Sequence, residues 1–294
     1  MVVQLNNNVS LVRISDLKTT TLFVFKTNLR NLSYLYHELR LLLLMSQYEH
    51  IIGKPTYIVT TELEEGKSSR VVGFILEYYE HGSLSTTLDS GKPFTVRWKL
   101  GWALQILDAL IHVIRGPDSF YSDLKPDNIV FTSPFDKLVL IHFEQAALLE
   151  SERESAMAYS LGKILWCIFE GGSYTHNSMD EKYEVPANVV FPQYKSTPRP
   201  VKELIRMLRE SLGYVSISQP DPTAQAKMSP REVVEASQNV WESRIFRMEK
   251  YVKVMSRLRE GNYDKSDELL LGVPLRPKFI YVFQKLQDLA RHEE

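Results

Sequence analysis

The chain has 294 residues, of which 44% are hydrophobic and 24% are charged, so it is an ordinary globular sequence, long enough for one large domain or for two lobes. Its 35 Lys and Arg residues balance 36 Asp and Glu residues to a net charge of -1, which disfavours nucleic acid or an anionic membrane as the main partner. The single cysteine excludes an internal disulfide, the first residues lack the features of a signal peptide, and no apolar run approaches the roughly 20 residues of a membrane span; we therefore expect a cytoplasmic protein.

The first fifty residues predict a hairpin followed by a helix. Two runs rich in β-branched and aromatic residues, Val9 to Ile14 and Thr21 to Phe25, flank a polar turn. From Asn31 to Gln47 the leucines recur at helical spacing, and Ser33 is the expected N-cap.

The next hundred residues predict two more strands and a long helix. The strands cover Tyr57 to Thr61 and Val71 to Tyr79, with a charged loop between them. Thr95 to Ile114 is strongly amphipathic, with apolar residues on one face.

A short stretch from Phe120 to Phe131 then combines an acid, a lysine and an asparagine ahead of an apolar strand. Lys125 follows Asp123 by two positions, and Asn128 follows it by five. Phosphoryl transfer needs these residue types: a carboxylate to orient and deprotonate a hydroxyl, a cation for the moving phosphate and a carboxamide oxygen for Mg²⁺. A proline-containing turn that feeds a strand is the simpler alternative.

The rest of the chain predicts a second hairpin and several helices. The hairpin covers Asn128 to Thr132 and Lys137 to Ile141 and runs into His142. Helices are expected at Ala158 to Trp166, at Val201 to Leu212, from Arg231 past Trp241 toward Arg259, and at Lys278 to Arg291.

Taken in this order, the segments resemble the protein-kinase fold from about Val9 to Trp241. The Asp123 stretch resembles the kinase catalytic loop, with Tyr121-Ser122 where that family usually has His-Arg. The resemblance implies an α+β, bilobal fold in one kinase-like domain. A small antiparallel sheet and one helix would form an N-terminal lobe over residues 1–80, and a mostly helical C-terminal lobe would cover residues 81–294.

The resemblance also implies roles for residues outside that stretch. Phe23-Val24-Phe25-Lys26 resembles the strand whose lysine pairs with the phosphates of ATP, and a helix glutamate, here Glu38, would pair with that lysine. The stretch from Leu76 to Leu84 resembles the hinge between kinase lobes, so the backbone at Glu77 and Tyr79 would bond the adenine edge.

Two features of kinases are missing. No glycine precedes Gly53, so no glycine-rich loop covers the phosphates. His142 stands where kinases have the aspartate of Asp-Phe-Gly, and a neutral imidazole is a poor ligand for Mg²⁺. We therefore expect Mg²⁺ binding, with Asn128 as the remaining ligand, to be weak or absent. His142 could instead be a general base or a packed histidine.

Three functions remain open. The first is an atypical ATP-dependent phosphotransferase; only 12 residues separate Glu144 from Met157, which favours a small-molecule hydroxyl over a protein chain as acceptor. The second is a pseudokinase that binds a protein partner as a scaffold. The third is a kinase pocket in which Asp123 and His142 perform acid–base chemistry without phosphoryl transfer. The sequence from Ile141 to Gln145 most resembles the corresponding sequences of divergent kinase-like proteins of filamentous fungi.

Overall fold

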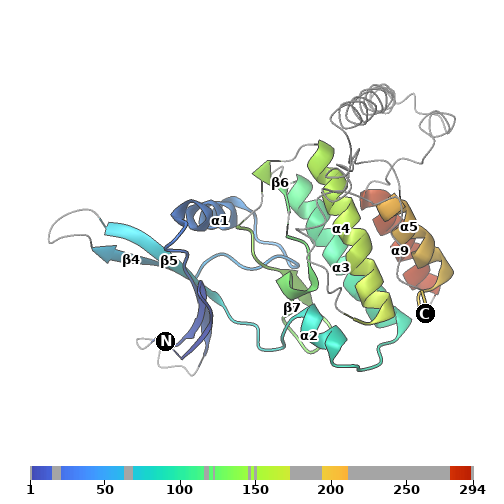
Figure 1. Cartoon of the computed structure of the whole chain (residues 1–294), viewed down its shortest axis with the longest axis horizontal. Helices are drawn as coiled ribbons and strands as arrows, with labels where there is room; N and C mark the ends of the chain where they lie inside the picture. Colours follow the sequence, from blue (N-terminus) through green and yellow to red (C-terminus); the bar gives the residue numbers. More distant parts are fainter. Residues whose placement is uncertain are drawn as a thin grey trace, which may run out of the picture.

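The fold is mixed α+β. The computed structural model describes residues 2–14, 21–62, 69–115, 119–121, 123–144, 147–148, 151–172, 194–210 and 279–292. A five-stranded antiparallel sheet with one helix beside it lies at one end of the molecule, and most of the other described helices lie at the opposite end (Figure 1). The helix expected from Arg231 to Arg259 lies outside the described residues.

The sheet has the strand order β1-β2-β3-β5-β4, and every neighbouring pair is antiparallel. Its strands are β1 (Val3–Asn6), β2 (Val9–Val12), β3 (Phe23–Lys26), β4 (Tyr57–Glu62) and β5 (Ser69–Glu77). The predicted hairpin of β2 and β3 and the predicted pair of β4 and β5 are confirmed. The edge strand β1 was not predicted, because all four of its side chains are exposed and no buried face marks it in the sequence.

The helix beside the sheet, α1 (Leu32–Leu44), buries Leu35, Leu39 and Leu42, together with Glu38. The prediction of Ser33 as its N-cap is wrong. The helix begins one residue before Ser33, so the cap position falls on Asn31. The side-chain oxygen of Asn28 accepts the backbone N–H of Asn31 at 3.0 Å and fixes the chain as it enters the helix.

The remaining described helices are α2 (Leu84–Asp89), α3 (Val96–Arg115), α4 (Ser151–Glu170), α5 (Arg199–Glu210) and α9 (Phe279–His292). The core centres on α3, whose predicted apolar face is buried at Leu100, Ala103, Leu107 and Leu110 and which packs against α4 and α9. α4 begins at Ser151, well before the predicted Ala158, because its first turn is polar and carries no apolar repeat. Among the described helices, none is both long enough and apolar enough to cross a membrane.

A second hairpin connects the sheet end of the molecule with the helices. It consists of β7 (Ile129–Phe131) and β8 (Leu138–Leu140), as predicted, and the short helix η1 (Pro126–Asn128) precedes it. Isolated bridges from Ile51 to Leu140 and from Ser83 to Val130 attach the loop after α1 and the start of α2 to this hairpin. A small pair, β6 (Ser119–Phe120) with β9 (Ala147–Leu148), lies on the two chain segments that flank it. The residues just before β7 and just after β8 are therefore held close together.

Candidate functional site

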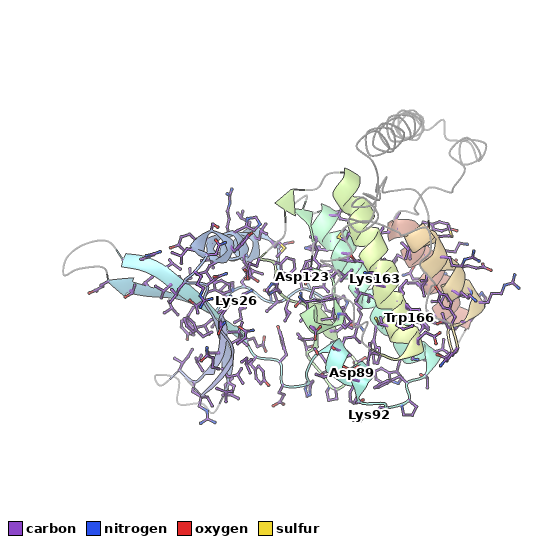
Figure 2. All side chains as sticks on the ribbon, viewed as in Figure 1. Lys26, Asp89, Lys92, Asp123, Lys163 and Trp166 are labelled. Carbon is purple, nitrogen blue, oxygen red and sulfur yellow. The ribbon has the colours of Figure 1, made fainter. Side chains whose placement is uncertain are left out.

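Lys26, the last residue of β3, faces inward and forms a buried ion pair. Its side chain is 6% exposed, and its ammonium contacts Oε2 of Glu38 on α1, whose side chain is 1% exposed. β3 can approach β5 this closely because residue 73 is glycine. A Cβ at Gly73 would lie 2.5 Å from the carbonyl oxygen of Lys26. The structure thus brings Lys26 and Glu38 together, as the resemblance implied. Figure 2 shows Lys26 at the sheet end of the molecule.

The residues of the stretch before β7 converge on Asp123, which is only 6% exposed. Lys125 donates from Nζ to Oδ2 of Asp123 at 2.9 Å. Asn128 donates from Nδ2 to the same Oδ2 and to the backbone oxygen of Asp123, both at 2.8 Å. The acid, the cation and the carboxamide predicted from local spacing therefore meet in one place, with the carboxylate held from two sides.

His142 lies between Lys26 and Asp123. Its backbone has a φ of 70°, in the left-handed region that few non-glycine residues adopt, and this bends the chain directly after β8. Nδ1 lies 3.3 Å from Nζ of Lys26, and Nε2 lies 3.8 Å from Oδ2 of Asp123. Burial, and next the charge of Lys26, lower the pKa of His142, so the ring is neutral at pH 7. An ammonium can only donate, so Nδ1 accepts and Nε2 carries the ring proton.

Glu144 completes the cluster, and sequence reasoning did not assign it a role. Its Oε2 lies 3.6 Å from Nζ of Lys26 and 3.8 Å from Nε2 of His142. Asn28, before α1, donates from Nδ2 to Oε1 of Glu144 at 3.0 Å. Local sequence gave no signal for this role, because the contacts of Glu144 with Lys26 and Asn28 span more than 100 positions of the chain.

Tyr121 is a second residue that sequence reasoning missed. Its hydroxyl donates to the backbone oxygen of Ile141, and its ring packs edge-on against Phe143 with 5.0 Å between centroids. Complete burial raises the pKa of Tyr121 well above its usual value, so the hydroxyl keeps its proton and remains a donor. The backbone N–H of Phe143 in turn donates to Oε1 of Glu38 at 2.8 Å. The bend that carries His142 and Glu144 is therefore anchored on both sides.

The side chains of Glu77 and Tyr79 lie away from this cluster. They line a pocket of about 330 Å³ together with residues of the loop after α1 and of the second hairpin. No residue of the Lys26–Asp123 cluster lines that pocket. Burial, followed by the charge of Glu77, raises the pKa of Tyr79 to about 12. The sequence assigned the backbone of these residues, not their side chains, to a nucleotide, and that role stays a prediction.

The cluster does not fit a resident Mg²⁺ ion. Within the described part of the chain, no group of three His, Cys, Asp or Glu side chains could hold a metal ion. Mg²⁺ requires near-octahedral oxygen coordination, whereas the position next to Asp123 offers an imidazole. Asn128, the predicted metal ligand, uses its carboxamide nitrogen on Asp123 and could offer one oxygen at most.

No protein-family model matches this chain, and no curated protein matches it either. The site is therefore defined by its geometry. Two ammonium groups, Lys26 and Lys125, and three carboxylates, Glu38, Asp123 and Glu144, surround one neutral imidazole. His142, whose pKa is lowered by burial and by the charge of Lys26, is the kind of perturbed group that clusters at functional sites.

Proposed function

We propose that the chain is an atypical, kinase-like phosphotransferase that uses ATP to phosphorylate a hydroxyl of a small molecule. The observation that carries the proposal is the setting of Asp123. Its buried carboxylate is fixed by Lys125 and Asn128. The imidazole of His142 lies between this carboxylate and the buried Lys26–Glu38 pair. Positioned charges of this kind supply most of the catalysis in phosphoryl transfer.

In this proposal the sheet and α1 form one lobe and the helices form the other, with the division near residue 80. The segment from Glu77 to Gly82 is the hinge, and its backbone bonds the adenine edge. The phosphates extend toward Lys26, and the acceptor hydroxyl approaches Asp123. This places the two substrates on opposite sides of His142, within reach of both charged centres.

The proposed step needs only groups that the cluster supplies. The acceptor hydroxyl gives its proton to the carboxylate of Asp123 while its oxygen bonds to the γ-phosphorus. The bond from that phosphorus to the bridging oxygen breaks, and ADP leaves with the electron pair. Lys125, whose side chain is 42% exposed, can follow the moving phosphoryl group while it remains near Asp123. We assign no step to a metal ion.

A second candidate function, a pseudokinase that acts as a binding module for a protein partner, is favoured by Glu144. A phosphate that approached Lys26 would have to replace this carboxylate. Loss of the glycine-rich loop and of the metal-binding aspartate points the same way, since one missing electrostatic element can cost about 10²–10³ in rate. The two candidates predict opposite results for the same experiment.

That experiment has a binding part and a turnover part. Thermal-shift titration with ATP, with and without Mg²⁺ or Mn²⁺, measures binding, because a ligand stabilises the folded protein by mass action. We expect stabilisation that depends little on the metal. ADP release is then measured with a panel of sugars, polyols and amino alcohols as acceptors.

Asp123→Asn and Asp127→Asn are the variants to compare in the turnover assay. Asp123→Asn keeps the shape of the side chain but removes its basic oxygen, so turnover should fall by about 10²-fold or more while ATP affinity stays near wild type. Asp127, two residues from Lys125 but exposed, is the matched control, and its substitution should leave turnover unchanged. ATP binding without ADP release by the wild type, with every acceptor of the panel, would favour the pseudokinase instead.

A further inference from the structure

The ammonium of Lys26 is almost completely enclosed by three neighbouring side chains. A lysine ammonium carries three N–H donors. Around Nζ lie Oε2 of Glu38, Nδ1 of His142 at 3.3 Å and Oε2 of Glu144 at 3.6 Å. The Lys26 side chain is 6% exposed, so open solvent offers no further direction of approach. A phosphate can reach this ammonium only by displacing one of its three neighbours.

Of these neighbours, Glu144 is the one that a phosphate would replace. Glu38 is almost completely buried and is held from its other oxygen by the N–H of Phe143. His142 is neutral, so moving it would not release any charge of Lys26. Glu144 is an acidic residue whose side chain is 12% exposed, and the hydrogen bond that it accepts within the described structure comes from Asn28. Its carboxylate oxygen therefore lies where an oxygen of an incoming phosphate would have to bind, next to the ammonium of Lys26.

We propose that Glu144 determines which ligands the site around Lys26 accepts, because its carboxylate pairs with Lys26 where a phosphate of the ligand would bind. The inference deepens the proposed function and rests on it for the identity of the ligand as a nucleotide. With Glu144 in place, the cluster has three carboxylates against two ammonium groups, so each phosphate of a ligand meets net repulsion. Each phosphate of a ligand therefore binds more weakly in the wild type than it would without the charge of Glu144.

The test compares three probes on three proteins. Adenosine, ADP and inorganic tripolyphosphate are titrated against the wild type, Glu144→Gln and Glu203→Gln, and dissociation constants are obtained from thermal shifts. Glu144→Gln should bind tripolyphosphate and ADP at least about tenfold more tightly, because two like charges a few ångströms apart repel strongly at low dielectric. Its affinity for adenosine should not change.

Glu203→Gln is the matched control for overall charge. Glu203, on α5, is also paired with a cation, Arg199, at 3.2 Å, but both side chains are more than half exposed. Its substitution removes the same charge from the protein and should change none of the three affinities. An equal gain in both variants would overturn the proposal, because general charge would then explain it.

A second variant keeps the proposal testable if Glu144→Gln does not fold. Glu144→Asp retains the negative charge but withdraws it by one methylene from Lys26, and it should increase the affinity for tripolyphosphate by a smaller factor. Unchanged affinity for tripolyphosphate in both Glu144 variants would overturn the inference. If Glu144→Gln gains affinity for tripolyphosphate but neither protein binds adenosine or ADP, the inference stands and the proposed nucleotide function falls. If nucleotides stabilise all three proteins equally, the inference about Glu144 falls and the proposed nucleotide function stands.

Discussion

Removing the charge of Lys26 should destabilise the protein more than removing the charge of Glu38. Lys26 is surrounded by Glu38 and Glu144, so Lys26→Met leaves two carboxylates without their shared cation. Glu38→Gln leaves Lys26 with the second carboxylate, 3.6 Å away. The glutamine also keeps an oxygen for the N–H of Phe143.

The magnitudes follow from burial. Breaking a buried ion pair from one side costs about 3–5 kcal/mol, because the remaining charge loses its compensation. We expect the full effect, about 4 kcal/mol, for Lys26→Met. We expect about 2 kcal/mol for Glu38→Gln, since two opposite charges near 4 Å still attract by about 4 kcal/mol at an effective dielectric of about 20. The double variant should cost less than the sum of the two by about 0.5–3 kcal/mol.

Urea denaturation at pH 7, followed by circular dichroism, measures all four free energies of unfolding. Lys137→Met serves as a matched control, because the Lys137–Glu49 pair is exposed and its removal should not shift the midpoint. A Lys26→Met protein as stable as the wild type would refute the reasoning. So would single-variant effects that simply add up in the double variant.

Two further predictions concern the bend after β8. Tyr121→Phe removes the hydroxyl that donates to the backbone oxygen of Ile141 and leaves that carbonyl without its donor. The free energy of unfolding, measured by urea denaturation, should fall by about 1–3 kcal/mol. An unchanged midpoint would mean that the bend is held without this hydrogen bond. The pKa of His142 is lowered in the folded state, so below the ordinary value of 6.5 the unfolded chain binds more protons at this residue than the folded chain does. His142 should therefore make the wild type less stable at pH 5.5 than at pH 7.5. His142→Gln should reduce that pH dependence when midpoints are compared at the two pH values, and an identical dependence in both proteins would contradict the assignment.

The sequence predicted best those features that depend on neighbouring residues. Asp123, Lys125 and Asn128 lie within six residues, so their spacing was enough to place them together. The buried face of α3 and the second hairpin follow in the same way from apolar periodicity and a polar turn.

The contacts that sequence reasoning missed connect distant parts of the chain. Asn28 and Glu144 are 116 positions apart, and no local pattern marks a glutamate that will face a lysine on another strand. The hydroxyl of Tyr121 bonds Ile141 across an intervening hairpin, so its role depends on how that hairpin folds back. The sequence did not predict that α4 begins as early as Ser151, because the first residues of the helix are polar and show no apolar repeat.

The burial of charge in this cluster is an argument for function that does not depend on the kinase resemblance. Apolar residues of similar volume are often as stable as a buried ion pair, or more so. The fold nevertheless buries Lys26 and Glu38 and holds His142 in a left-handed conformation, which costs a non-glycine residue about 1–3 kcal/mol. Stability alone does not account for such an arrangement. The proposed binding of a charged ligand offers an explanation, because the groups that weaken the free protein would then be the contacts that bind and orient that ligand.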